Sequence, residues 1–92
     1  MLYFLTYEYD EGNDTGGAGY EGIYADAFTA LEVAIANFRN NYRAFMDMGG
    51  WYRVDVFAVS ESNDEESAFE MWENEELPDQ GDVLFLSTCM FE

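Results

Sequence analysis

The sequence predicts one α+β domain over residues 1–92: a small, largely antiparallel three-stranded sheet, one long helix packed on one face, and a short acidic helix. Three observations favour this class. Residues 2–9 are rich in apolar and aromatic residues, and apolar residues alternate along 51–60, as they do in strands. Over 24–47 they recur at steps of three and four, as on the buried side of an amphipathic helix. A length of 92 residues suits a single domain.

The first strand, residues 2–9, is apolar on both faces at its start, with Leu2 and Phe4 on one side and Tyr3 and Leu5 on the other. A strand that is buried on both faces usually lies inside a sheet, so we expect a central position. The segment 10–22 that follows holds five of the eight glycines. Such a glycine content is typical of a flexible loop.

The long helix is predicted over residues 24–47. Gly49 and Gly50 end it, because glycine commonly terminates helices. We expect its buried stripe to comprise Tyr24, Phe28, Leu31, Ile35, Phe38, Tyr42 and Phe45.

A second strand is predicted over 51–60, with Tyr52, Val54, Val56 and Ala58 on one face. A short helix is predicted over 65–75, which ends before Pro78 and Gly81. A last strand is predicted over 82–91. The short helix has three apolar residues that can anchor it to the sheet, namely Ala68, Phe69 and Trp72.

The charge is extreme for a chain that can fold. There are 20 acidic residues and three arginines, with no lysine and no histidine, which gives a formal net charge of −17. Apolar residues still make up 49% of the chain and aromatic residues 18%. A disordered acidic tail would be poor in aromatics. The negative electrostatic field of such a folded domain attracts basic surfaces. The commonest large basic surfaces are those of nucleic-acid-binding proteins.

Compartment signals favour the cytoplasm. Cys89 is the only cysteine, so an internal disulfide is excluded, as suits a reducing compartment. The apolar start at residues 1–5 has no basic residues before it and differs from a signal peptide. No apolar run approaches the roughly 20 residues that span a bilayer.

Most enzyme chemistries lack their usual groups here. Without histidine or lysine there is no imidazole base, no Schiff-base amine and no imidazole metal ligand. Cys89 has no histidine to activate it and is expected to be a small buried residue. Pairs of carboxylates can do acid–base or metal chemistry, but chance pairs are inevitable among 20 acids. We therefore expect no catalytic residues, no cofactor and no metal site.

Two motifs fall in the glycine-rich segment. Residues 17–22 match G-x-G-x-x-G, but four nearby acids would repel a phosphate, and the chain is too short for a Rossmann unit. Asp10, Asp14 and Glu21 take positions 1, 5 and 12 of a calcium loop. Gly12 stands at a ligand position of that loop, and Thr15 stands where glycine is required. Weak, nonspecific cation binding remains the alternative.

Acidic runs are the strongest functional signal. The segment 61–76 contains eight acids and no basic residue, and on a helix Glu66, Glu70 and Glu73 lie about 5–6 Å apart, close to the phosphate spacing of a nucleic-acid strand. Carboxylates placed in this way can occupy arginine and lysine sites meant for phosphates. The expected partner-binding residues are Glu61, Asp64, Glu65, Glu66, Glu70, Glu73, Glu75 and Glu76, with Asp10, Glu11 and Asp14 as a second patch.

In size, charge and aromatic content, the whole chain resembles the small acidic inhibitors that phages encode against host defences: DNA mimics, anti-restriction proteins and anti-CRISPR proteins. This resemblance implies stoichiometric inhibition of a defence nuclease or a CRISPR surveillance complex in the cytoplasm of an infected bacterium. The partner is expected to be a basic nucleic-acid-binding protein, with no direct contact to nucleic acid or membrane. Two alternatives stay open: an acidic antidote or adaptor that binds a basic protein without DNA mimicry, and an enzyme or metal protein that uses clustered carboxylates.

Overall fold

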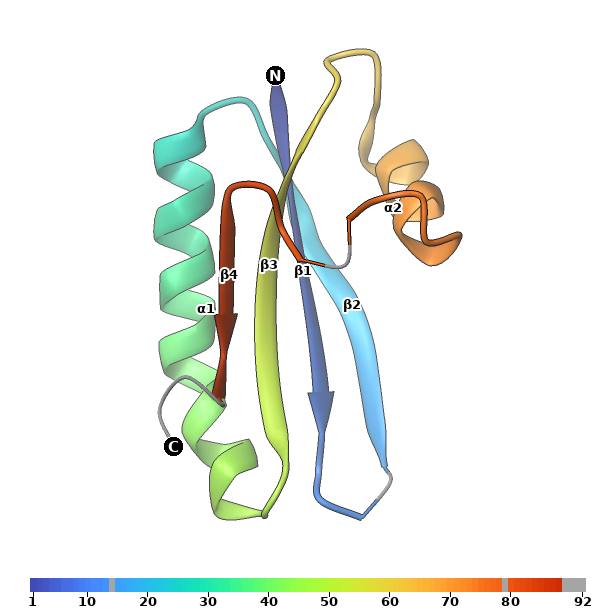
Figure 1. The fold of residues 1–92 in the computed structure, drawn as a ribbon. Helices are drawn as coiled ribbons and strands as arrows, with labels where there is room; N and C mark the ends of the chain where they lie inside the picture. The colour runs from blue at the N-terminus through green and yellow to red at the C-terminus, as the bar shows by residue number, and fades with distance from the viewer. Residues whose placement is uncertain (14, 79, 89–92) are drawn as a thin grey trace.

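The computed structural model describes residues 1–13, 15–78 and 80–88. Strands and helices follow in the order β1 (Leu2–Asp10), β2 (Gly16–Tyr24), α1 (Ala27–Asp47), β3 (Trp51–Val59), α2 (Glu65–Glu73) and β4 (Leu84–Ser87). The strands form one antiparallel sheet in the order β2-β1-β3-β4, and Figure 1 shows α1 and α2 on opposite sides of it. The α+β class is confirmed, with a fourth strand that the sequence pattern does not predict.

β1 lies between β2 and β3, which confirms its expected central position. Its odd-numbered residues, such as Leu5 and Tyr7, pack in one hydrophobic cluster with α1. Its even-numbered residues Leu2 and Phe4 pack in a second cluster, with residues of α2. We call these two sides of the sheet the α1 face and the α2 face.

The expected loop over 10–22 is wrong, because residues 16–24 form the edge strand β2. On the α1 face, Gly17 pairs with Tyr9 and Gly19 pairs with Tyr7. A Cβ atom at either glycine would lie 2.6 Å from the hydroxyl oxygen of its partner tyrosine. The tyrosine side chains therefore cover the glycines, as cross-strand aromatics do when they compensate for strand glycines. Glycine has no apolar side chain, so the sequence of β2 shows no alternation of apolar and polar residues. The strand therefore cannot be recognised from that pattern.

α1 has a defined cap at each end. It begins after Asp26, whose carboxylate accepts a hydrogen bond from the Thr29 N–H at 3.0 Å. Its start lies three residues later than expected, because Tyr24 still belongs to β2. At the other end Gly49 has φ 81°, and its N–H and that of Gly50 bond back to carbonyls of the last turn in a Schellman motif. Among the described residues, no helix is long and apolar enough to cross a membrane.

The buried stripe of α1 is rotated from the predicted one. Its fully buried residues are Ala30, Ala34 and Phe38, whereas Phe28 is 76% exposed and Ile35 is 38% exposed. Large rings on the sheet, including Tyr52, already fill much of the layer between sheet and helix. Small residues on the helix let the two backbones approach across that layer, so alanine rather than phenylalanine or isoleucine faces the sheet.

β3 shows the expected alternation, with Tyr52, Val54 and Val56 in the cluster under α1 and Phe57 and Val59 in the cluster under α2. β4 pairs with β3 and is shorter than the predicted strand over 82–91. Cys89, and the prediction that it is buried in a strand, lie outside the described residues.

Candidate functional site

The acidic helix α2 has a precise beginning. Asp64 accepts a hydrogen bond from the Ser67 N–H at 2.8 Å, and the Asp64 N–H donates to the Ser67 hydroxyl oxygen at 3.0 Å. This capping box satisfies N–H groups that the first turn would otherwise leave unpaired. The backbone bond from Ser67 also lowers the pKa of the Asp64 carboxyl. One of the predicted contact acids therefore has a structural role in starting the helix.

The apolar side of α2 anchors it to the sheet, as the sequence predicts. Ala68 is buried, and Phe69 and Trp72 pack against the cluster that contains Phe4 and Phe57. The Phe69 ring lies 5.8 Å from that of Trp72 and 5.0 Å from that of Tyr20, centroid to centroid. Such aromatic contacts add to the area buried and fix the orientation of the helix. The acids on α2 are thus presented by a helix that is anchored to the sheet.

Three acids form a row on the outer side of α2. Glu66, Glu70 and Glu73 are exposed and are spaced four and three residues apart, which places them on one side of the helix. At about 1.5 Å per residue, the steps between them are about 6 Å and 4.5 Å along the helix axis. Glu65 leaves this row and reaches toward β2, where a Cβ on Gly22 would lie 3.3 Å from its Oε1. We call Glu66, Glu70 and Glu73 the acidic row.

The remaining predicted acids of this segment are exposed too, but their contacts and backbone conformations differ. Glu61 accepts a hydrogen bond from the Met1 ammonium group at 2.6 Å, and this contact lowers the pKa of its carboxyl. Glu75 has φ 58°, a left-handed conformation in the turn that ends α2, and Glu76 follows it. Throughout the part of the chain that the structure describes, no acid of residues 64–76 forms an ion pair with an arginine.

The second predicted patch is remote from the first. Asp10 ends β1, and Glu11 follows it in the β1–β2 turn, at the opposite end of the sheet from α2 in Figure 1. The Asp10 carboxylate accepts a hydrogen bond from the Gly12 N–H at 2.7 Å, so it helps to shape that turn. Asp14 lies outside the described residues. The structure therefore does not join the two patches into one surface.

The calcium-loop spacing does not correspond to a loop. Asp10 pairs with Gly16 at the end of the hairpin, whereas Glu21 lies in β2 at the register shift opposite Leu5 and Thr6. Strand geometry separates these two acids by about 15 Å. Glu21 instead accepts a hydrogen bond from the Asn37 side chain of α1 at 2.6 Å. No group of three or more metal-binding side chains gathers in the described part of the chain.

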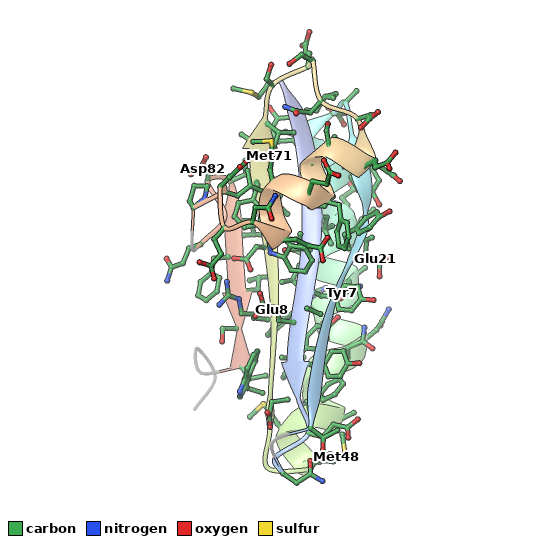
Figure 2. All side chains as sticks on the ribbon, turned by 90° about the vertical axis from the view of Figure 1, so that its right-hand side faces the viewer. Tyr7, Glu8, Glu21, Met48, Met71 and Asp82 are labelled. Atoms are coloured by element: carbon green, nitrogen blue, oxygen red, sulfur yellow. The ribbon has the colours of Figure 1, made fainter. Side chains whose placement is uncertain are left out.

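A groove of about 460 Å³ lies beside α2 on the α2 face. Figure 2 looks onto this face, with α2 across the upper part of the sheet and Glu8 below the helix. Apolar lining comes from the helix, the sheet and the segment that follows α2, and three acids share the lining with Arg53. The lining residues are Glu8, Ala18, Arg53, Phe57, Phe69, Trp72, Glu73, Glu75, Leu77 and Pro78.

Arg53 is held on the sheet by its neighbours. Its Nε donates to the Asp55 carboxylate at 3.0 Å, and its guanidinium lies 5.4 Å from the centre of the Phe85 ring. Asp55 is 1% exposed and also accepts a hydrogen bond from the Gly81 N–H at 3.1 Å. Burial raises the pKa of the Asp55 carboxyl, although Arg53 and Gly81 act in the opposite direction. Arg53 also lines a second groove, of about 460 Å³, that includes Trp51 and Phe85.

Sequence reasoning missed Glu8 as a site residue and missed the groove. The available signal was on the α2 face of β1, where Glu8 is the first charged residue after Leu2, Phe4 and Thr6. It pairs across the sheet with Arg53, so the two opposite charges share one face. Glu8 and Arg53 form one groove with Trp72 and Glu75 only because of where α2 packs, and no local sequence pattern encodes that packing.

Comparisons of this chain with protein-family models, with curated proteins and with solved structures found no match. The geometry and charge of the site itself are therefore the basis for a function.

Proposed function

We propose that this chain is a stoichiometric inhibitor that binds a basic nucleic-acid-binding protein and presents carboxylates in place of phosphates. The observation that carries the proposal is the acidic row, Glu66, Glu70 and Glu73, exposed without arginine partners on a helix that Phe69 and Trp72 anchor. A fixed row of anions loses little freedom when it binds, so more of the interaction energy appears as affinity. The proposed setting is the cytoplasm of an infected bacterium, with a defence nuclease or CRISPR surveillance complex as target.

The distribution of charge supports the acidic row as the binding surface. α1 contains two of the 20 acids and two of the three arginines, so its formal charge is zero and the whole −17 lies on the rest of the chain. A field of one sign accelerates association with a partner of the opposite sign. A partner that normally binds a phosphate backbone has that opposite sign.

The groove gives the proposal a specific contact. Glu8, Glu73 and Glu75 line it together with the aromatic residues Phe69 and Trp72. An arginine side chain from the partner can lie against an aromatic ring and pair with a carboxylate in such a groove. We therefore propose that an arginine of the target's phosphate-binding surface enters the groove while its neighbours contact the acidic row.

One feature favours the alternative of an acidic adaptor that does not imitate DNA. The groove also has an apolar lining that includes Phe57, Leu77 and Pro78. An apolar side chain of a basic partner could serve as the anchor there, with the acids acting only in steering. Competition with DNA separates the two functions, because only a phosphate mimic must occupy the nucleic-acid site.

The first test is capture of the target with a charge-reversed variant. Glu66→Lys, Glu70→Lys and Glu73→Lys are combined in one chain, and the immobilised protein is used to recover partners from bacterial lysate for mass spectrometry. A second chain with Glu32→Lys, Asp47→Lys and Asp82→Lys undergoes the same change in net charge away from both predicted acidic patches. We expect the wild type and this control to recover one basic protein that the first variant does not recover.

Kinetics on the recovered protein then test the role of steering. Reversal of the acidic row should slow association more than it accelerates dissociation, because long-range attraction acts mainly on the association rate. A first variant that is folded by circular dichroism and still binds as well as the wild type would place the binding surface elsewhere. Loss of binding in the control alone would assign it to the surfaces that carry Glu32, Asp47 and Asp82.

A further inference from the structure

The outer side of α1 is an exposed surface that the proposed function does not use. It lies opposite the buried residues Ala30, Ala34 and Phe38. Phe28, with 76% of its surface exposed, is the most exposed of the large apolar side chains in the described residues, and Ile35 is 38% exposed. Helical spacing places six exposed residues on this side, namely Phe28, Glu32, Ile35, Ala36, Arg39 and Arg43. We call them the outer face of α1.

Two opposite charges on this outer face have no partner among the described residues. In the described part of the chain, Glu32 and Arg39 have neither an ion pair nor a hydrogen bond through their side chains. They are seven residues apart, which is about 10.5 Å along the helix axis and too far for direct pairing. Ile35 and Ala36 lie between them. The face thus consists of an apolar centre flanked by an anion on one side and a cation on the other.

We propose that a second copy of this chain packs its α1 antiparallel against this face, with the two-fold axis between Ile35 and Ala36. That axis places Glu32 opposite Arg39 of the second copy and Arg39 opposite Glu32 of the second copy. Both charges are then paired, and the Glu32–Arg39 pair forms twice because the interface is isologous. Ile35 lies against Ala36 of the other copy, where the small side chain lets the helices approach.

The charges on α1 favour a second copy over a basic partner. Arg39 and Arg43 would repel a basic surface, which finds its acids elsewhere on the molecule. A second copy instead meets each charge with its opposite. The same axis brings Phe28 to Arg43 of the second copy, and that guanidinium already lies 5.8 Å from the centre of the Tyr42 ring. A guanidinium between two aromatic rings is a favourable arrangement.

The distribution of net charge also favours the outer face of α1 as the dimer interface. Two chains of −17 repel each other, and α1 is the segment whose own charge is zero. Contact through α1 leaves α2, on the opposite side of the sheet, directed away from the second copy (Figure 1). One helix face is small beside the roughly 800 Å² per partner of a standard interface. We therefore expect a weak dimer, formed between micromolar and millimolar concentration, that does not depend on the proposed function.

Sedimentation velocity on full-length chains tests the pairing through charge reversal. Glu32→Arg places like charges at both pairing positions of a homodimer, and Arg39→Glu does the same with opposite sign. Each single variant should dimerise at least about tenfold more weakly than the wild type, because two pairs are lost and two repulsions are created. An equimolar mixture of the two variants should restore dimerisation, because every pair across the interface is again of opposite sign.

The double variant with both Glu32→Arg and Arg39→Glu should also dimerise as the wild type does. Asn40→Arg, an exposed change on the same helix but beside the outer face, is the matched control and should leave dimerisation nearly unchanged. Circular dichroism checks that each variant is folded. A wild type that stays monomeric at millimolar concentration, or single variants whose mixture does not associate, would overturn the proposal. If the wild type is strictly monomeric and Ile35→Asp loses target capture, the proposal is overturned as well. The outer face of α1 is then assigned to binding of the target.

Discussion

The two faces of the sheet differ in how fully a helix covers them. The α1 face is covered by a helix of 21 residues, and its core is a continuous set of aromatic and small side chains. The α2 face is covered by a helix of nine residues, which leaves a groove beside it. Buried polar groups also collect there, since Thr6 and Asp55 are paired neighbours on this face and each is 1% exposed.

We interpret this contrast as a division between stability and the proposed binding. The α1 face holds a packed core, and the charges on α1 itself sum to zero. The α2 face has less apolar cover, a strained left-handed residue at Glu75 and acids without arginine partners. Proteins commonly accept such local costs where they bind other molecules. The α1 face therefore stabilises the fold, and the α2 face presents the candidate site.

The largest effect is expected from Phe38→Ala. Phe38 is 2% exposed and stacks on Tyr42 with ring centroids 4.9 Å apart, so truncation leaves a cavity in the core of the α1 face. We expect a loss of about 3–5 kcal/mol in the free energy of unfolding, measured by urea titration. Phe28→Ala is the matched control on the same helix and should change stability by less than about 0.5 kcal/mol. Equal effects of the two variants would contradict the observed rotation of the helix.

Gly19→Ala should also destabilise the α1 face, but less. The added Cβ would lie 2.6 Å from the Tyr7 hydroxyl oxygen, so the ring must leave its place over β2. Overpacking of this kind costs about 1–3 kcal/mol, and urea titration again measures it. Ala18→Ser, at the neighbouring residue that lines the groove on the other face, should be close to neutral. A stable Gly19→Ala variant would show that the tyrosine cover is dispensable.

The pH dependence of stability should show the burial of Asp55. Because its pKa is raised above the ordinary 3.8, the folded state holds this proton more tightly than the unfolded state. Its contribution is therefore full below pH 3.8 and declines as the pH rises through the raised value. Thermal melts should show the wild type losing stability relative to Asp55→Asn as the pH rises above 3.8 and through the raised pKa. A difference between the two that is independent of pH would contradict the assignment.

The smallest effect is expected from Thr6→Val on the α2 face. The Thr6 hydroxyl is buried and has no hydrogen-bond partner in the described part of the chain. Valine keeps the shape and removes the unsatisfied group, so the variant should be more stable by about 1 kcal/mol. Chemical denaturation measures the change. A destabilised variant would indicate that the hydroxyl is hydrogen-bonded in solution.

Much of the fold follows from periodicity. The apolar and aromatic content of β1, the alternation along β3 and the apolar side of α2 are all local patterns, and each of these elements lies where its pattern predicts. β2 was missed because its interior glycines carry no apolar signal, and their role depends on tyrosines from the next strand. The rotation of α1 was missed for a related reason. Ala30 and Ala34 are buried because the sheet supplies the large rings.

The candidate site was predicted in part. The density of acids in 61–76 and the anchors Phe69 and Trp72 are visible in sequence. Four of these acids, Glu65, Glu66, Glu70 and Glu73, lie with the anchors on one helix, as expected. The structural roles of Asp64 and Glu61 depend on a cap and on a contact with Met1 across 60 positions of sequence. Glu8 joins the groove only because α2 packs over the face on which β1 presents it. Long-range packing of this kind leaves no trace in local composition.

Competition between this chain and duplex DNA for the captured target tests the central claim most directly. The target is held on a surface, the chain is bound to saturation, and labelled duplex is added at physiological salt, with the chain and duplex alone as a control for direct contact. We expect mutual exclusion, with each ligand raising the apparent Kd of the other in proportion to its concentration. A stable ternary complex of target, chain and duplex would contradict phosphate mimicry and favour the adaptor function.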